Sequence, residues 1–474
     1  MSVRRAAAPV VALAVWTGLV GVAPAVAATD PDALWYLTET GVEEVHARTT
    51  GEGITIAVID GPVNPAAPDL VGANLVVRPS FCHSQDGVTP SETSDRPDAD
   101  HATGTVALLI GTGAGVNGQP GIRGVAPGAT VLSYAMLPPN WETSSGGERL
   151  CYDADGAPNG RFLAQSIDDA VAQGADIISM STGGAWSAED GAAVARAYAA
   201  GVVVVAAPDN DGSSATWPGL GNGVVMVEMT DSAMQLDAEG DTTSHPYLGV
   251  VAPGADVRWY DASDGLWDSY ELASGTSIAT PWTAGVLALA WSLHPEATGN
   301  QMIQALIHTT AVDPGFGHDD QWGYGPVAVR KLVEADPTQY PDENPFLRPV
   351  DVTEDADGMP IIPTTQEVLD AVAAASGAPV ASASPSPSAS GPAPSAEARP
   401  EGEEPKPEAG AEAGAGAAVP IAIGLGAAAL LAAVVVLLRR RSGTTTATAG
   451  APSSQSTPST QSTQSTVPAA RKEP

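Results

Sequence analysis

Three polar residues, far apart in the sequence, have side chains that could together carry out nucleophilic catalysis. Asp60 ends one apolar run, His101 opens another, and Ser277 stands between Gly-Thr and Ile-Ala-Thr-Pro. A carboxylate can orient an imidazole, which can take the proton of a hydroxyl that attacks a carbonyl carbon. Taken singly, the aspartate could cap a turn and the histidine could cap a helix. Only the combination of all three predicts a hydrolase.

The residues around Ser277 predict that it lies at the start of a helix. Pro281 follows four residues later, and proline is tolerated only in the first turn, where its missing N–H has no partner. We therefore expect a helix that begins near Ser277. The hydroxyl and the backbone N–H of Ser277 would then lie at the positive end of the helix dipole.

The elements that must position these residues alternate between strand and helix. Runs rich in β-branched residues predict buried strands, and stretches with helical periodicity lie between and after them. The strands are expected at 53–59, 129–135, 175–180 and 202–207, and the helices at 103–109, 162–172, 188–199, 277–293 and 300–308. This alternation predicts an α/β fold, with a mostly parallel sheet covered by helices on both faces. Reactive residues in such folds collect at the carboxyl ends of the strands.

The motifs that contain these three residues resemble the subtilase family of serine proteases, in which acid, base and nucleophile also follow the order Asp, His, Ser. These motifs are Ala-Val-Ile-Asp at 57–60, His-Ala-Thr at 101–103 and Gly-Thr-Ser-Ile-Ala-Thr-Pro at 275–281. Two further segments, Gly-Val-Ala-Pro-Gly-Ala at 124–129 and Val-Ala-Pro-Gly at 251–254, match other landmarks of the family. The resemblance covers about residues 35–340. It implies a subtilisin-like three-layer sandwich with a mostly parallel central sheet.

The resemblance also implies a role for each site residue. Asp60 would orient His101 and stabilise its cation, His101 would take the proton of Ser277, and Ser277 would attack a peptide carbonyl. The oxyanion would be bound by the backbone N–H of Ser277 and by the side-chain amide of Asn210. Asn210 could instead be a turn residue. Ser181, Thr182 and Gly183 resemble the edge of the family's sites along which an extended peptide substrate adds as a strand.

Four positions depart from the family pattern. Gly61 replaces the Ser or Thr that usually follows the acid, and Ala102 replaces the glycine after the histidine. Pro208-Asp209 precede Asn210, and Trp282 stands where a histidine is usual. No catalytic group is missing, so we expect a serine endopeptidase. The alternative is a catalytically impaired scaffold that holds a membrane complex together.

Both ends of the chain carry targeting signals. Residues 1–27 read as a secretory signal peptide, with the alternative of an uncleaved anchor. The apolar run 417–438 is long enough to cross a membrane, and three arginines follow it at 439–441, which predicts a cytoplasmic C-terminus and an extracellular peptidase domain. The alternative for this run is a buried helix of a soluble domain. The remaining segments are an N-terminal extension at 28–50, the peptidase domain at 51–345, a C-terminal extension at 346–376, a Pro/Ala/Ser/Glu-rich linker at 377–416 and a disordered tail at 439–474.

This arrangement resembles the mycosins, membrane-anchored subtilases associated with type VII secretion. The resemblance implies a secreted protein as the substrate and a type VII secretion membrane complex as a partner. Nucleic acid is excluded as a partner, because the net charge of −35 would repel phosphates.

The two cysteines, Cys82 and Cys151, lie in the part predicted to be extracellular, where disulfides persist. We expect a disulfide between them, with two free buried thiols as the alternative. No cofactor is expected. Acidic pairs such as Asp153 and Asp155 leave a calcium site open, but no complete calcium-loop signature is present.

Overall fold

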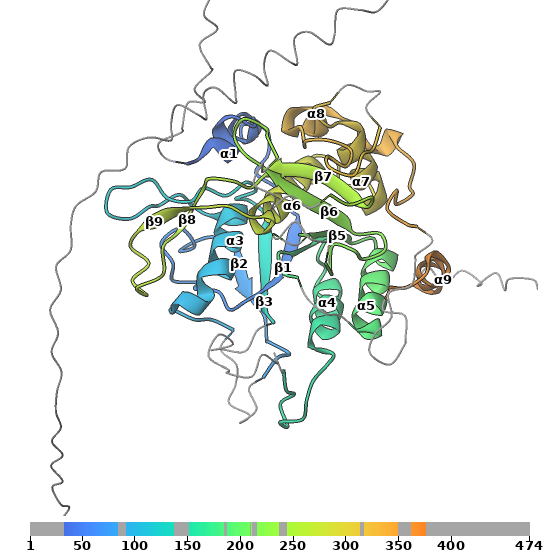
Figure 1. Cartoon of the computed structure of the whole chain (residues 1–474), viewed down its shortest axis with the longest axis horizontal. Helices are drawn as coiled ribbons and strands as arrows, with labels where there is room; N and C mark the ends of the chain where they lie inside the picture. The colour runs from blue at the N-terminus through green and yellow to red at the C-terminus, as the bar shows by residue number, and fades with distance from the viewer. Residues whose placement is uncertain are drawn as a thin grey trace, which may run out of the picture. The chain divides into compact units, whose positions relative to one another are not determined.

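Seven parallel strands form the centre of the protein in the computed structural model (Figure 1). The structure describes residues 33–83, 92–136, 151–183, 187–208, 210, 216–236, 244–312, 317–348 and 362–375. The predicted signal peptide, linker, apolar segment at 417–438 and tail lie outside these ranges. Among the described residues, no helix has the length and apolar character needed to span a membrane.

The sheet confirms the predicted parallel arrangement. Its strands are β1 (Thr55–Asp60), β2 (Leu75–Val77), β3 (Thr130–Ala135), β4 (Ile177–Met180), β5 (Val203–Ala206), β6 (Val225–Thr230) and β7 (Leu248–Pro253). Their order is β2-β3-β1-β4-β5-β6-β7, and every neighbouring pair is parallel. Strand β1 lies between β3 and β4, with Ile56 opposite Val131 and Ile177. Asp60 therefore leaves the sheet at the carboxyl end of a central strand.

Helices cover both faces of the sheet, as the alternating pattern predicts. The long helices are α3 (Asp100–Ile110), α4 (Phe162–Ala172), α5 (Ala188–Ala199), α6 (Thr276–Ser292), α7 (Gly299–His308) and α9 (Thr365–Ala375). Alternate side chains of β1 enter two different cores: Ile56 and Val58 join the core of α3, α6 and α7, whereas Ala57 and Ile59 join that of α4 and α5. Figure 1 shows α4 and α5 side by side, with α9 beside α5. The fold is thus a three-layer α/β sandwich.

The described part of the N-terminal extension belongs to the folded body. Its two short helices, α1 (Trp35–Thr38) and α2 (Val42–Val45), bury apolar side chains in the larger core. The Trp35 indole donates to the Ala255 carbonyl at 3.1 Å, and the Trp282 indole donates to the Tyr36 carbonyl at 2.8 Å. These contacts are typical of a segment that wraps the domain.

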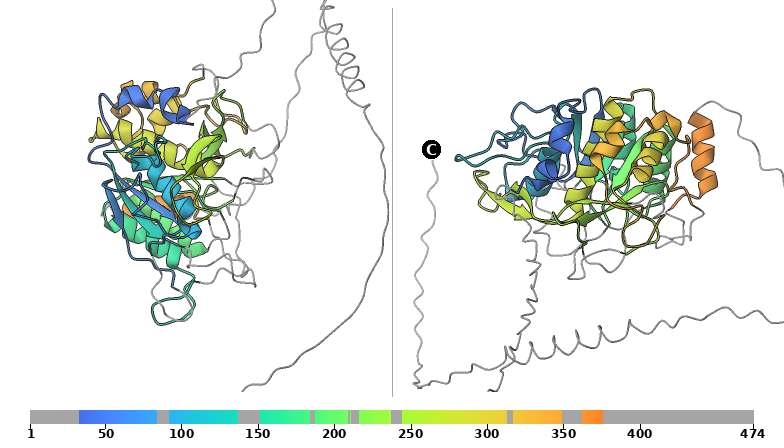
Figure 2. Two further views of the ribbon diagram at one scale, coloured as in Figure 1. Left: turned by 90° about the vertical axis from the view of Figure 1, so that its left-hand side faces the viewer. Right: turned by 90° about the horizontal axis from the view of Figure 1, so that it is seen from above.

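An antiparallel hairpin, β8 (Val257–Tyr260) and β9 (Tyr270–Ala273), extends from the body (Figure 2). The fully buried Asp69 anchors it, because its carboxylate accepts hydrogen bonds from the hydroxyls of Tyr260 and Tyr270 at 3.0 and 2.7 Å. The remaining short helices are α8 (Val329–Glu334), η1 (Pro97–Ala99) and η3 (Pro337–Gln339). A disulfide joins Cys82 and Cys151, which confirms the predicted pairing.

Candidate active site

Asp60 and His101 form a hydrogen-bonded pair. Asp60 is the last residue of β1 and His101 the second residue of α3, and His101 Nδ1 lies 2.9 Å from Asp60 Oδ1. The Asp60 side chain is 3% exposed, whereas that of His101 is 46% exposed. Because an ionised carboxylate only accepts hydrogen bonds, Nδ1 carries the proton in this contact. The other ring nitrogen, Nε2, is then the one that can accept a proton.

The electrostatics of the pair favour the charged imidazole. Burial by itself would lower the pKa of His101, but the Coulomb attraction and hydrogen bond of Asp60 raise it above its ordinary value. Asp60 Oδ1 also accepts a bond from the Gly61 N–H at 2.6 Å. Asp60 Oδ2 is buried and has no hydrogen-bond partner among the described residues. One oxygen thus carries both contacts of this carboxylate.

Asp100 adds a second carboxyl group next to the pair. It precedes His101 at the start of α3, and its Oδ1 is buried without a hydrogen-bond partner in the described ranges. Burial, together with the charge of Glu271, raises the pKa of Asp100 to about 7. Near neutral pH this carboxyl is therefore partly protonated. This behaviour could not be predicted from the sequence, since both the burial of Asp100 and its neighbour Glu271 on β9 arise only in the folded chain.

Ser277 is the second residue of α6 and is bonded to Ser181 in both directions. The Ser277 hydroxyl donates to the Ser181 carbonyl at 3.1 Å, and the Ser181 hydroxyl donates to the Ser277 carbonyl at 3.0 Å. Among the described residues, no hydrogen bond joins Ser277 to His101. Catalytic hydrogen bonds are often long in structures without substrate and tighten when it binds.

The position of Pro281 explains why the Ser277 carbonyl accepts a hydrogen bond from the Ser181 hydroxyl. The helix begins near Ser277 as predicted, but the prediction that Pro281 lies in the first turn is wrong, because α6 starts at Thr276 and Pro281 is its sixth residue. Inside a helix, residue 281 would normally donate its N–H to the Ser277 carbonyl. Proline has no N–H to donate, and the Ser181 hydroxyl takes this place.

Asn210 lies against the start of α6. Its Oδ1 accepts hydrogen bonds from the backbone N–H and the hydroxyl of Thr276, both at 2.9 Å. These bonds fix the orientation of the amide. A Cβ atom built on Gly275 would lie 3.6 Å from Asn210 Oδ1, 3.7 Å from the Ser277 backbone nitrogen and 3.8 Å from Asn210 Nδ2. Both predicted oxyanion donors therefore border the same small space beside Gly275.

The predicted site residues lie at the ends of two neighbouring strands and at the starts of two helices that pack together. β1 and β4 are neighbouring parallel strands, so Asp60 and Ser181 lie side by side at the carboxyl ends of these strands. Helices α3 and α6, which begin at His101 and Ser277 to within one residue, pack against each other. Beyond Ser181, Thr182 is half-buried and Gly183 is exposed. The edge that the sequence predicted for substrate binding thus runs from the site to the surface.

Two of the departures from the family pattern are neighbours in space. A Cβ atom on Gly61 would lie 3.9 Å from the Ala102 Cβ atom, in ordinary contact. The chain therefore lacks a side chain at 61 and has gained a methyl group beside that position. Trp282 is fully buried and holds the N-terminal extension through its indole N–H. Asp209 lies outside the described residues.

Trp259 of the hairpin is a site neighbour that the sequence analysis missed. Its ring centroid lies 6.4 Å from that of His101. Its ring also lies over Gly104, where a Cβ atom would approach the indole to 2.1 Å. Gly104 therefore allows the hairpin to pack on α3 one turn after His101.

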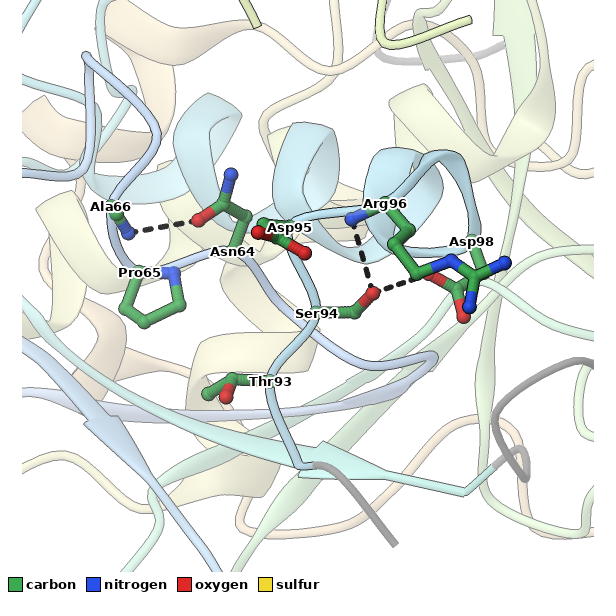
Figure 3. Close-up of a pocket in the computed structure, with 8 residues that line it drawn as sticks. All are labelled: Asn64, Pro65, Ala66, Thr93, Ser94, Asp95, Arg96 and Asp98. Atoms are coloured by element: carbon green, nitrogen blue, oxygen red, sulfur yellow. Dashed lines mark hydrogen bonds between the residues drawn. The ribbon is translucent and has the colours of Figure 1, made fainter. Parts of the chain in front are cut away.

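A hollow of about 450 Å³ is formed by two segments close in sequence to Asp60 and His101 (Figure 3). It is lined by 64–66, which follow Asp60 along the chain, and by 93–96 and Asp98, which precede His101. Figure 3 shows Ser94 bonded to Asp98 on one wall and Asn64 on the other. Within the described ranges, no three His, Cys, Asp or Glu side chains are grouped closely enough to hold a metal ion.

Comparison with known proteins agrees with the fold and the motifs. The pattern of the Subtilase family matches residues 51–325, and the chain belongs to this family. It is 30% identical to Subtilisin E of Bacillus subtilis (strain 168) over 295 residues, which are 60% of this chain and 67% of that protein. It is also 30% identical to a Subtilisin of Bacillus pumilus, of which 92% is covered. These relatives identify the chain as a subtilisin-like serine protease.

Among solved structures, the MycP3 protease from the type VII (ESX-3) secretion system has the same fold. Its TM-score is 0.51 at 23% identity, over 65% of this chain and 90% of that one.

Proposed function

We propose that this protein is a membrane-anchored extracellular serine endopeptidase that hydrolyses peptide bonds through Asp60, His101 and Ser277. The observation that carries the proposal is the 2.9 Å hydrogen bond between Asp60 Oδ1 and His101 Nδ1. This bond leaves Nε2 as the proton acceptor of a half-exposed imidazole, at the edge of the sheet where Ser277 is held by Ser181.

In the proposed reaction, the Ser277 hydroxyl turns from the Ser181 carbonyl towards His101 Nε2. As Oγ attacks the substrate carbonyl carbon, its proton passes to Nε2, and Asp60 stabilises the imidazolium. The negative oxygen enters the space beside Gly275, between the Ser277 N–H and the Asn210 amide. His101 then protonates the leaving amine, and a water molecule releases the acyl group by the same steps. The substrate would lie extended along Ser181, Thr182 and Gly183.

The proposed location rests on the sequence. A signal peptide at 1–27 and an apolar segment at 417–438 followed by three arginines would place the peptidase domain outside the cell and the C-terminus inside. The same arrangement supports a mycosin-like protease linked to type VII secretion. The substrate would be a secreted protein, and the partner a type VII secretion membrane complex.

The alternative is a catalytically impaired scaffold of such a complex. Two observations favour it: the Ser277 hydroxyl donates to the Ser181 carbonyl rather than to His101, and Asp60 Oδ2 has no hydrogen-bond partner in the described part of the chain. Under this alternative the chain would keep its fold and its partners without turnover.

A fluorophosphonate probe separates the two functions, because it reacts with activated serine hydroxyls. The protein, its Ser277→Ala variant and a Ser274→Ala control are incubated with the probe and assayed for peptide cleavage. Ser274 is a suitable control because it lies only three residues before Ser277 in the sequence. Its side chain is exposed and accepts a hydrogen bond from the Asp256 N–H. We expect labelling and cleavage by the protein and the control, and neither by Ser277→Ala. Absence of labelling in the unmodified protein would favour the scaffold, and cleavage by Ser277→Ala would refute the assignment of the nucleophile.

A further inference from the structure

A second pocket lies at the other end of the strands from the proposed active site. It has a volume of about 190 Å³ and is lined by Tyr247, His318, Tyr324, Phe346 and Arg348, together with two prolines. Tyr247 directly precedes β7, whereas Asp60 is the last residue of β1 and Ser181, which holds Ser277, directly follows β4. Because the strands are parallel, the two sites lie at different ends of the strands.

Aromatic rings form the walls of this pocket. The Tyr324 ring meets those of His318 and Phe346 edge-on, with centroids 5.0 and 6.1 Å apart. The guanidinium of Arg348 lies over the Tyr247 ring, 3.8 Å from its centroid. His318 is fixed by a hydrogen bond between Nε2 and the Leu248 carbonyl at 2.8 Å. The pocket is therefore preformed by side chains that hold one another in place.

Arg348 is the only arginine or lysine among the described residues that line this pocket, and its hydrogen-bond partners are uncharged. Its two terminal nitrogens donate to the carbonyls of Phe346 and Leu220 at 3.2 and 2.7 Å. Its Nε is buried without a hydrogen-bond partner among the described residues. Its backbone is fixed as well, since the Arg348 N–H donates to Asn222 Oδ1 at 3.0 Å. In the described ranges, no carboxylate forms an ion pair with it.

Arg348 combines partial burial with the lack of an ion pair, in a chain that has 55 acidic and 20 basic residues. Five other arginines in the described part of the chain pair with carboxylates: Arg78 with Asp169, Arg123 with Glu43, Arg161 with Glu189, Arg196 with Asp168 and Arg330 with Glu44. Arg48 and Arg96 form no ion pair within the described ranges, but both are exposed to solvent, whereas Arg348 is partly buried. Burial lowers the pKa of Arg348 to about 10, so the side chain is still charged at neutral pH. A partly buried cation without a counter-charge is stabilised when an anion binds beside it.

We propose that this pocket binds a carboxylate carried on a short aromatic body. Arg348 would hold the carboxylate, and Tyr247, Tyr324 and Phe346 would contact the apolar part. The volume is below the roughly 300–1,000 Å³ of pockets for drug-sized ligands, so the ligand is a small aromatic acid or the C-terminal residue of a peptide.

The test is a titration of the full chain, with the Ser277→Ala change to prevent hydrolysis, using 4-fluorophenylacetate followed by fluorine NMR. The neutral 4-fluorophenylacetamide is the matched control ligand. Because a hydrogen bond to a charged group contributes about 1.5–3 kcal/mol, we expect the acid to bind at least about tenfold more tightly than the amide. Equal binding of acid and amide, or no saturable binding of the acid, would overturn the proposal without reference to any variant of the pocket.

Two variants assign the binding to this pocket. Arg348→Gln should weaken binding of the acid about tenfold or more, and Arg330→Gln, which removes an exposed paired arginine, should leave it unchanged. Competition by acetyl-Gly-Phe, compared with its C-terminal amide, then shows whether a peptide terminus also enters. Binding that persists in Arg348→Gln would place the ligand elsewhere. The result does not depend on proteolytic activity, so it stands or fails separately from the proposed function.

Discussion

Replacing Ser181 with alanine tests how the nucleophile is positioned. The change removes the hydroxyl that donates to the Ser277 carbonyl at 3.0 Å and leaves the backbone carbonyl of residue 181 in place. Because Pro281 has no N–H, no helical hydrogen bond can replace the lost one. Leaving a carbonyl without its partner costs about 1–3 kcal/mol. We expect Ser181→Ala to lower the free energy of unfolding by this amount.

The Pro281→Ala variant supplies the missing N–H and completes a double-mutant cycle. In that background the Ser277 carbonyl can bond to the N–H of residue 281, so Ser181→Ala should cost less by about 1–2 kcal/mol. The assay is equilibrium unfolding in urea of the four proteins, all with Ser277→Ala to prevent self-digestion. A coupling energy within about 0.5 kcal/mol of zero, the usual scatter for independent sites, would refute the reasoning.

Three further predictions follow from the structure. Removing the disulfide by replacing Cys82 and Cys151 with alanine should lower the free energy of unfolding by about 4 kcal/mol, because the bridge spans 69 positions, and urea unfolding with and without reductant measures this. The raised pKa of His101 predicts an NMR titration midpoint above about 6.5 for its imidazole. The pairing with Asp60 should therefore stabilise the fold below about pH 6.5, and this stabilisation should be lost as the pH rises through the pKa of the folded state. Asp60→Asn should bring the midpoint below about 6.5, and an unchanged midpoint would contradict the pairing. Gly275→Ala places a methyl group beside both predicted oxyanion donors, in ordinary contact with its surroundings. We expect kcat to fall about tenfold or more, while the melting temperature stays within a few degrees of that of the unmodified protein. An unchanged kcat would place the oxyanion elsewhere.

Much of the sheet and its helices could be predicted because their signals are local. The apolar β-branched runs that end at Asp60 and Ala135 are strands in the structure, and the predicted helix 162–172 has the same bounds as α4. The sequence analysis missed β6 and β7. Their runs are interrupted by the buried Glu228 and by Gly249, which weaken the pattern of a buried strand.

The residue types of the site could be predicted from motifs, but their contacts could not. The hydrogen bond between Asp60 and His101 follows from an expected arrangement. The two hydrogen bonds between Ser181 and Ser277 depend on where α6 meets the end of β4. The place of Pro281 within α6 is a matter of a few residues at a helix end, where local signals are weakest. No sequence motif marks Arg348 as a candidate binding residue. Its uncharged hydrogen-bond partners can be seen only in the folded chain.

The most direct test of the account is whether the base and the nucleophile act as one unit. The measurement is kcat for peptide cleavage by Ser277→Ala, by His101→Ala and by the variant that carries both changes. If the two residues form one proton-transfer unit, the double variant should lose no more activity than the more damaging single variant. Losses that multiply in the double variant, or cleavage that survives Ser277→Ala at the rate of the unmodified protein, would contradict it.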